Sequence, residues 1–352
     1  MRKLGIGVLG VGAMGKRHAE NIRRFVPEAR LVAVADPAPG RASQLATELE
    51  IEHGFLSLDD MLETKDIQCV VIATPDKFHP QSVRAAAAAG KQIFCEKPLA
   101  LSLPDARAAL EVVARAGVHL QMGFMRRYDP GYAAAMKRIN AGEIGEPVIF
   151  KSIGRDKTAP PISEYQSQLN GMLFYNNTIH DFDLARWLMR DEVTAVQAYA
   201  TVAIRPEVAD YGDIVAGVVN LKYGRGAIGN IESYVQAVYG HDIRTEIAGS
   251  KGTILVGSIE HHPVTFLASE GSSQKLADHF LTRFEDAYVA EMRDFVQNML
   301  QDRAPWVTGE DGLRALEIAV AAESSYLQSK VISVAQSEGR PAGAGGTNAQ
   351  GT

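Results

Sequence analysis

One lysine and one histidine in this chain have the neighbours and spacing needed to move a proton during a reaction. Lys97 stands in the run Glu96-Lys97-Pro98, directly after the apolar segment 92–95, and His180 stands in a helix-like run over 178–189. Imidazole titrates near neutral pH and can accept a proton, and an ammonium group can stabilise a developing alkoxide. Together they could deprotonate an alcohol that loses hydride. The structural alternative is a surface lysine and a hydrogen-bonded core histidine.

A glycine-rich turn near the N-terminus predicts where a dinucleotide binds. The apolar segment 4–9 predicts a strand, and the turn after it has the spacing G-x-G-x-x-G before a helical run. In this pattern the first glycine permits a tight turn, the second permits close approach of a pyrophosphate, and the third permits close packing of helix on strand. The unpaired N–H groups at the helix start attract phosphate. The turn residues predicted to bind the cofactor are Gly10, Gly12, Ala13, Met14 and Gly15.

The acidic residue expected after such a turn is Asp36, which follows the apolar segment 31–35 and lies 21 residues beyond Gly15. A carboxylate there accepts hydrogen bonds from the adenosine ribose and repels a 2′-phosphate, so NAD is favoured over NADP. Arg41 is close enough in sequence to keep NADP as an alternative. Asp36 could also simply initiate a turn before Pro37.

Alternation of strand and helix continues from there and predicts a Rossmann-type domain over residues 1–122. Apolar strands are expected at 69–73, 92–95 and 118–122, and helices at 80–89 and 103–116. Continuous apolar strands are typical of a parallel sheet covered on both faces. The loop Thr74-Pro75 and the turn Glu96-Lys97-Pro98 follow two of these strands, at the edge where doubly wound sheets bind ligands.

The pattern changes after residue 123. Strand-like runs at 148–153, 193–203, 214–223, 227–235 and 243–248 follow one another with few helices between them, which predicts an open, mostly antiparallel sheet. Further helices are expected at 178–189, 284–300 and 311–329. The fold class is therefore α/β, with an N-terminal Rossmann domain and a C-terminal α+β domain over 123–335 for substrate binding and oligomerisation. The Gly- and Ala-rich tail, 336–352, is expected to be disordered.

Composition excludes several other classes. The 352 residues carry a net charge of −6 and are 46% hydrophobic, so there is no basic surplus typical of nucleic-acid binding. No apolar run reaches the roughly 18 residues of a membrane span. Cys69 and Cys95 both lie in apolar runs and are expected to be reduced and buried, which favours the cytoplasm. No metal site is predicted.

Five motifs in order resemble one enzyme family. They are the turn 10–15, Glu96-Lys97-Pro98, the run 123–129, the run 178–183, and Tyr239-Gly240-His241-Asp242. Over residues 4–332 the chain is similar to the glucose-fructose oxidoreductase and inositol dehydrogenase family, most closely to its inositol 2-dehydrogenase branch. The resemblance implies a Rossmann domain followed by an open sheet whose outer face packs in homodimers or homotetramers.

The resemblance also implies an activity and a set of site residues. The family oxidises a secondary hydroxyl of a cyclic polyol or sugar and passes hydride to NAD. By residue-to-residue correspondence, Lys97 holds the substrate hydroxyl and His180 removes its proton, with Asn176 as the third catalytic position. The implied cofactor contacts beyond the glycine turn and Asp36 are Thr74, Pro75, His79, Glu96 and Lys97. The implied substrate contacts are Lys97, Arg127, Arg155, Asn176, His180, Tyr239 and His241.

Two positions depart from the inositol branch. Asn176 stands four residues before His180, where an aspartate is usual, and the spacing places Asn176, His180, Asp183 and Trp187 on one helical face. An amide carries no charge, so Lys97 loses a possible anionic partner and could share the role of base. His241 stands where a tyrosine is frequent. These changes leave two alternatives open: a pyranose or glycoside 3-dehydrogenase of the same family, and a non-catalytic NAD(P)-binding regulator.

Overall fold

The computed structural model describes residues 3–167, 171–257, 260–269 and 271–334. Contacts divide the chain into two compact units. Unit 1 runs to Tyr128 and includes Asp286–Leu316, and unit 2 comprises Asp129–Glu285 and the chain from Glu317 onward. Within the described residues no helix is long and apolar enough to cross a membrane.

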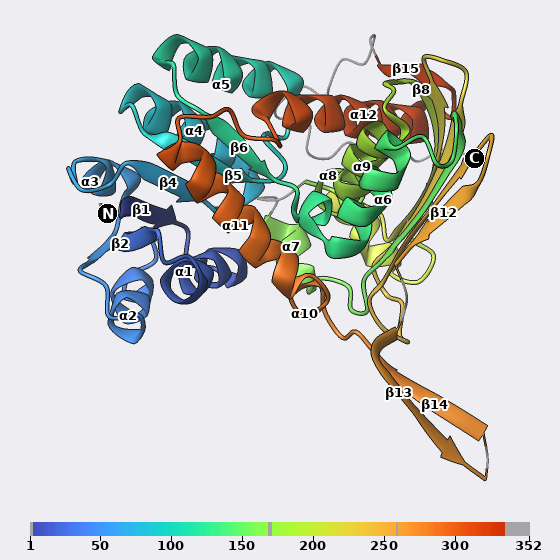
Figure 1. Cartoon of the computed structure of the whole chain (residues 1–352), viewed down its shortest axis with the longest axis horizontal. Coiled ribbons are helices and arrows are strands. Elements are labelled where there is room, and N and C mark those ends of the chain that lie inside the picture. Colours follow the sequence, from blue (N-terminus) through green and yellow to red (C-terminus); the bar gives the residue numbers. More distant parts are fainter. Residues whose placement is uncertain (1–2, 168–170, 258–259, 270, 335–352) are drawn as a thin grey trace. The chain divides into compact units, whose positions relative to one another are not determined.

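Unit 1 is built on a six-stranded sheet in which every pair of neighbouring strands is parallel (Figure 1). The strand order, β3-β2-β1-β4-β5-β6, is that of a dinucleotide-binding Rossmann sheet. The strands are β1 (Leu4–Leu9), β2 (Ala29–Ala35), β3 (His53–Phe55), β4 (Cys69–Ile72), β5 (Gln92–Glu96) and β6 (Leu120–Gly123). In this order the reversal between β1 and β4 places the loops after these two strands at the crevice that binds ligands in such sheets.

Helices cover both faces of this sheet (Figure 1). They are α1 (Ala13–Phe25), α2 (Arg41–Glu48), α3 (Leu58–Leu62), α4 (His79–Ala88), α5 (Leu103–Ala116) and α11 (Glu285–Leu300), with 3-10 turns at Asp76–Phe78 and Met125–Tyr128. Helix α5 begins where the Ser102 side chain accepts a hydrogen bond from the Asp105 N–H, and it ends at Gly117, whose φ is +66°. Met292 and Phe295 of α11 belong to the apolar core that α1 and α2 form on the sheet.

Unit 2 contains a seven-stranded sheet in the order β12-β11-β7-β10-β9-β8-β15. The strands are β7 (Pro147–Arg155), β8 (Val193–Thr201), β9 (Ala216–Tyr223), β10 (Ile228–Tyr234), β11 (Asp242–Gly249), β12 (Thr253–Val256) and β15 (Ile332–Ser333). Only β7 and β10 pair in parallel, and all other neighbours are antiparallel. Burial alternates along β7, where Phe150, Ser152 and Gly154 are buried and face the helices.

The helices of unit 2 lie on one face of that sheet (Figure 1). They are α6 (Pro130–Asn140), α7 (Ile162–Ser167), α8 (Leu173–Asn176), α9 (Ile179–Met189) and α10 (Phe280–Arg283), with a 3-10 turn at Pro206–Tyr211. Helix α12 (Gly309–Gln328) crosses from unit 1 to unit 2 after Leu316. The hairpin of β13 (Glu260–Ala268) and β14 (Gly271–Leu276) extends away from the sheet.

The predicted fold class is confirmed, because a parallel Rossmann sheet precedes a mixed, mostly antiparallel open sheet. One local expectation is wrong. Asn176 does not share a helix with His180, since α8 ends at Asn176 and α9 starts at Ile179. The side chain of Thr178 bonds to the Leu173 carbonyl and to Ser233, which holds the chain between the two helices.

The sequence-based domain bounds, 1–122, 123–335 and 336–352, remain a proposal. The structure differs from them in assigning Asp286–Leu316 to unit 1. The predicted disordered tail, 336–352, lies outside the described residues.

Candidate functional site

The β1–α1 turn has the geometry that a dinucleotide pyrophosphate needs. Gly10 has a φ of +84°, which side-chain-bearing residues rarely adopt. A Cβ on Gly15 would lie 1.7 Å from the Gly10 carbonyl oxygen, so helix α1 can pack here only without a side chain. A Cβ on Gly12 would meet no atom within 4 Å. Gly12 therefore borders open space beside the N-terminus of α1, where Ala13 and Met14 begin the helix and free N–H groups attract phosphate.

Asp36 connects the end of β2 to this turn. Its carboxylate accepts one hydrogen bond from the Val11 N–H and one from the Ala38 N–H, both at 2.9 Å, and the side chain is buried. Each oxygen keeps a second lone pair that can accept a ribose hydroxyl. The structure therefore brings Asp36 together with the glycine turn, as the fingerprint predicts. Arg41, the residue behind the NADP alternative, begins α2 and is exposed.

His79 joins the loop after β4 to the turn after β5. Its Nδ1 lies 2.6 Å from the carbonyl oxygen of Pro98, and its Nε2 lies 2.8 Å from that of Thr74. Both ring nitrogens thus contact main-chain oxygens. His79 positions the Thr74-Pro75 loop against the Lys97 turn, and no ring nitrogen is left over for the cofactor contact that the resemblance implies.

Glu96 is the last residue of β5, and its carboxylate lies beside the chain at Lys97. One oxygen contacts Nε2 of His18 at 2.7 Å, and the other accepts the Lys97 N–H at 3.3 Å. Burial opposes ionisation of Glu96, yet the hydrogen bond from His18 and the nearby charges of His18 and Lys97 lower its pKa below the ordinary value. Lys97 therefore has an anionic neighbour even though position 176 is an asparagine.

Arg127, expected near the substrate, is buried in unit 1. Its guanidinium donates a hydrogen bond of 2.9 Å to Asp311. Asp311 also accepts hydrogen bonds from the N–H and the hydroxyl of Thr308. This arrangement ties the chain after β6 to the start of α12.

In unit 2, His180 lies in the first turn of α9 and is buried, with 8% of its surface exposed. Asp181 beside it is fully buried and accepts a 2.6 Å hydrogen bond from Ser152 of β7. Gly154 allows this approach, because a Cβ there would lie 2.8 Å from the Asp181 carboxylate. The contact between α9 and β7 thus fixes the helix that carries His180.

Asp156 was missed by sequence reasoning and lies at the centre of a hydrogen-bond network. Its carboxylate accepts a 2.5 Å hydrogen bond from Nδ2 of Asn177 and lies 2.9 Å from Nδ1 of His241. Nε2 of His241 is buried and has no hydrogen-bond partner among the described residues. Asp156 thus connects His241 to the α8–α9 junction, where Asn176 and His180 lie. The available signal was its position just past the end of a predicted strand.

Arg155 and Tyr239 contact each other instead of joining that network. The Arg155 guanidinium donates to the Tyr239 hydroxyl at 2.6 Å and to Glu232 at 2.8 Å, and the Tyr239 hydroxyl donates to Asp242 at 2.8 Å. Since Gly154 faces Asp181, the alternation along β7 turns Arg155 to the opposite face. No described hydrogen bond joins Arg155 to the network that contains His241.

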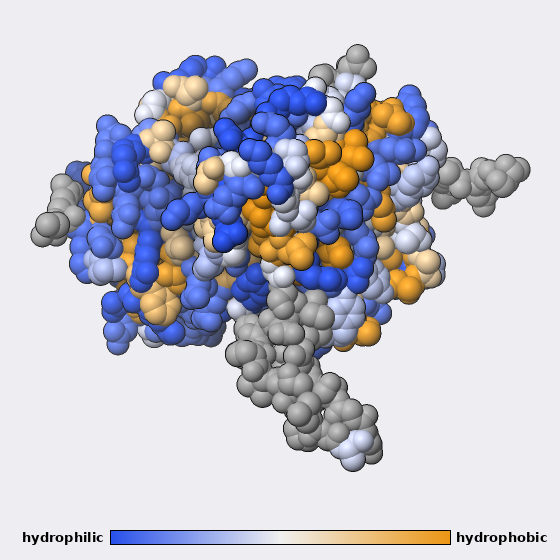
Figure 2. Space-filling view, turned by 45° about the vertical axis from the view of Figure 1, so that its right-hand side comes forward, coloured by the Kyte–Doolittle hydropathy of each residue, from blue (hydrophilic) through white to orange (hydrophobic). Residues whose placement is uncertain are grey.

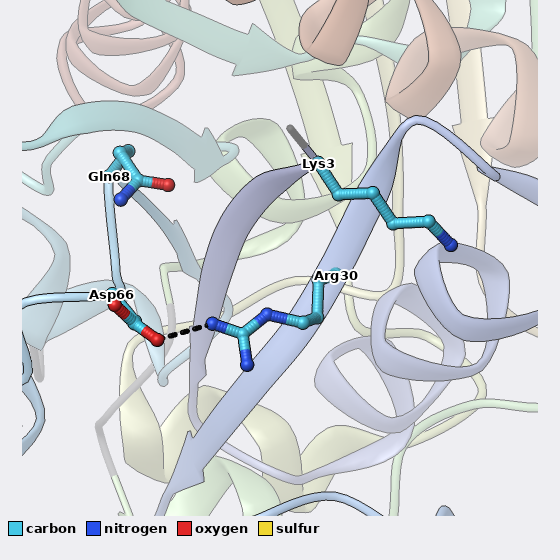
Figure 3. A pocket seen from close by; sticks show the side chains of 4 residues that line it. All are labelled: Lys3, Arg30, Asp66 and Gln68. Atoms are coloured by element: carbon cyan, nitrogen blue, oxygen red, sulfur yellow. Dashed lines mark hydrogen bonds and ion pairs between the residues drawn. The ribbon is translucent and has the colours of Figure 1, made fainter. Parts of the chain in front are cut away.

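A surface pocket elsewhere in unit 1 does not contain any predicted site residue. Figure 3 shows its lining, Lys3, Arg30, Asp66 and Gln68, with Arg30 and Asp66 paired at 2.6 Å. Lys3, Arg30 and Gln68 lie just before or at the start of β1, β2 and β4. They therefore mark the amino ends of these strands, whereas the glycine turn follows the carboxyl end of β1.

Comparison with known proteins shows similarity over nearly the whole chain. Residues 4–124 match the model of an oxidoreductase family with an NAD-binding Rossmann fold, and residues 136–334 match that family's C-terminal alpha/beta domain. The NAD-dependent scyllo-inositol 2-dehydrogenase of Bacillus subtilis is 42% identical over 91% of this chain and 93% of its own length. The myo-inositol 2-dehydrogenase of Thermotoga maritima is 34% identical over 93% and 97%.

A solved structure shows the same architecture. The scyllo-inositol dehydrogenase of Lactobacillus casei, crystallised with NAD(H) and scyllo-inositol, superposes with a TM-score of 0.90 at 30% identity. The alignment covers 95% of this chain and 100% of that structure.

Proposed function

Because the chain belongs to the oxidoreductase family with an NAD-binding Rossmann fold, we propose that it oxidises a secondary hydroxyl of a cyclic polyol of the inositol type to a ketone, with NAD as hydride acceptor. The observation that carries the proposal is the 42% identity, across nine-tenths of the chain, to an NAD-dependent scyllo-inositol 2-dehydrogenase. The glycine turn and Asp36 support NAD as the cofactor.

The proposed mechanism gives Lys97 and His180 separate roles. His180 would remove the proton from the substrate hydroxyl oxygen as hydride leaves the carbon that bears this hydroxyl, because a ketone forms only if both are lost. Lys97 donates a hydrogen bond to the substrate oxygen and stabilises its developing negative charge. His180 is the proposed base because imidazole titrates near neutral pH, and Lys97 has the carboxylate of Glu96 as its neighbour.

The remaining predicted site residues have different support. His241 and Asn177 lie at either end of the network around Asp156, and Asn176 directly precedes Asn177. This placement supports a role of His241 and Asn176 in recognising hydroxyl groups. Arg155 and Tyr239 lack that support, since their side chains are engaged by each other and by acidic residues. Substrate contact by Arg127 would have to share its guanidinium with Asp311.

We also propose that the chain forms homodimers or homotetramers through the outer face of the unit 2 sheet. The strand register places four exposed apolar side chains on that face, Tyr199, Val218, Ile228 and Leu255. Helices cover only the other face (Figure 1), and apolar surface lies among polar residues on the side that Figure 2 turns forward. Exposed apolar surface of this kind marks protein interfaces. Light scattering tests the proposal, and Tyr199→Glu should lower the measured mass.

A cytoplasmic location remains part of the proposal. It is supported by Cys69 and Cys95, which are buried and form no disulfide.

A substrate panel tests the proposed activity. Inositol isomers, free hexoses and glycosides are each supplied with NAD and, separately, with NADP, and the absorbance of the reduced nicotinamide is followed. The proposal expects the fastest reduction with an inositol and NAD. Faster turnover of a pyranoside would favour the 3-dehydrogenase alternative. Binding of NAD without reduction on any member of the panel would favour the regulator.

A further inference from the structure

Unit 1 encloses a cluster of three ionisable side chains that the mechanism above does not use as a group. His18 comes from α1, Glu96 from the end of β5, and Glu291 from α11. Their exposures are 0%, 6% and 0%. One nitrogen or oxygen from each lies within 4.8 Å of the others, the only such group of three or more among the described residues. The ring of His18 meets Phe94 and Tyr288 edge-on, at centroid distances of 5.1 and 6.1 Å.

Glu291 is the unusual member of the cluster. Neither of its carboxyl oxygens has a hydrogen-bond partner among the described residues. Burial, followed by the charge of Glu96, raises the pKa of Glu291 well above its ordinary value, whereas the pKa of Glu96 is lowered. Two carboxyl groups this close in an apolar interior do not both ionise. The cluster therefore holds one carboxylate and one carboxylic acid.

The hydrogen bonds show which group holds each proton. Nε2 of His18 donates a hydrogen bond to Glu96 at 2.7 Å, because a carboxylate can only accept, and Nδ1 of His18 is buried with no hydrogen-bond partner among the described residues. Glu96 accepts this bond and the Lys97 N–H, which favours its ionised form. The acid proton then belongs to Glu291. The other titratable groups acting on the cluster are Lys97 and His79 near Glu96, and Tyr128 near Glu291.

A metal ion would explain the cluster less well. Two donors bound tetrahedrally to one zinc ion at about 2.1 Å lie about 3.4 Å apart. The 2.7 Å between Nε2 of His18 and the Glu96 oxygen is instead a hydrogen-bond distance.

We propose that Glu291 is a positioning residue that stays protonated, so that Glu96 remains the ionised carboxyl group of this cluster, beside Lys97. If Glu291 lost its proton, a second negative charge would stand beside Glu96, and repulsion between the two carboxylates would displace the Glu96 oxygen from the Lys97 N–H. The effect of Glu291 on catalysis rests on the proposed function, in which Lys97 contacts the substrate. The protonation state of Glu291 does not depend on that function.

The first test measures urea unfolding of the full chain against pH for wild type and Glu291→Gln, an uncharged mimic of the acid. The folded pKa of Glu291 lies above its unfolded value, so wild type loses stability as pH rises past the unfolded pKa. Relative to Glu291→Gln, its unfolding equilibrium constant should therefore rise about tenfold per pH unit above about pH 5. Glu111→Gln, at an exposed glutamate of α5, should show no such slope. Parallel curves for wild type and Glu291→Gln would overturn the proposal.

A second measurement does not depend on stability. Infrared difference spectra of wild type minus Glu291→Gln at neutral pH should contain the carbonyl band of a protonated carboxylic acid. A carboxylate band instead, or a stoichiometric metal in purified wild type that Glu291→Gln lacks, would contradict the proposal.

The role in catalysis is read from the pH profile of turnover. Wild type should lose turnover at alkaline pH as Glu291 ionises, and Glu291→Gln should move that loss to higher pH. An unchanged alkaline limb would overturn the positioning role. If wild type turns over no polyol, the proposed function fails, while the unfolding and infrared results still test the buried proton.

Discussion

Replacing Gly12 with alanine should weaken NAD binding without unfolding the protein. The backbone at Gly12 has a φ of −68° and a ψ of −167°, which any residue adopts, and a Cβ there meets no protein atom within 4 Å. The stability change should therefore stay within about 1 kcal/mol. The added methyl group would occupy space assigned to the pyrophosphate. Overpacking of this kind costs roughly 1–3 kcal/mol, so the affinity for NAD should fall roughly 5- to 150-fold.

The matched variant is Gly15→Ala, three residues further along the same turn. Its Cβ would lie 1.7 Å from the Gly10 carbonyl oxygen, so the main chain itself would have to move. This variant should lose about 3 kcal/mol or more of stability. Calorimetric titration with NAD and thermal unfolding of both variants separate the two effects. Wild-type NAD affinity in folded Gly12→Ala would refute the assignment of this space to the cofactor.

Three further predictions concern local features. Burial raises the pKa of Asp213 from 3.8 to about 6, so its contribution to stability is complete below the unfolded value and is lost as pH rises to about 6, by at most roughly 3 kcal/mol. Asp213→Asn should remove this loss in urea unfolding at pH 4 to 7. Ser102→Ala removes the N-terminal cap of α5 and should cost about 0.5–2 kcal/mol in the same assay. Asn176→Asp should change the pH dependence of turnover because it adds a carboxylate on the helix before His180; an identical profile would count against a role for position 176.

Much of unit 1 could be predicted because its signals are local. Continuous apolar strands, glycine at the tight turn and at the end of α5, and the acidic residue after β2 each determine structure within a few residues of themselves. The helix predicted at 103–116 has those bounds in the structure. The adjacency of Asp36 and the glycine turn also followed, since the parallel order places the ends of β1 and β2 side by side.

The features that were missed depend on contacts between distant parts of the chain. Glu291 lies beside His18 and Glu96 because α11 packs on the Rossmann sheet. The sequence of α11 alone does not indicate that it packs there. In the sequence, Asp156 is only a polar residue that follows a strand. In the fold, the start of β11 and the α8–α9 junction place His241 and Asn177 beside it. The break between Asn176 and His180 was missed because spacing alone cannot distinguish one helix from two consecutive ones.

Transfer of a labelled hydride from inositol to NAD is the strongest test of the proposed oxidation. Wild type is incubated with NAD and scyllo- or myo-inositol that carries deuterium on its ring carbons, and the reduced cofactor is analysed by mass spectrometry and proton NMR. We expect one deuterium at the nicotinamide C4 position, with inosose as co-product, and loss of this transfer in His180→Ala despite retained NAD binding. Reduced cofactor without deuterium, or no reduction of NAD by any inositol, would contradict the proposed oxidation.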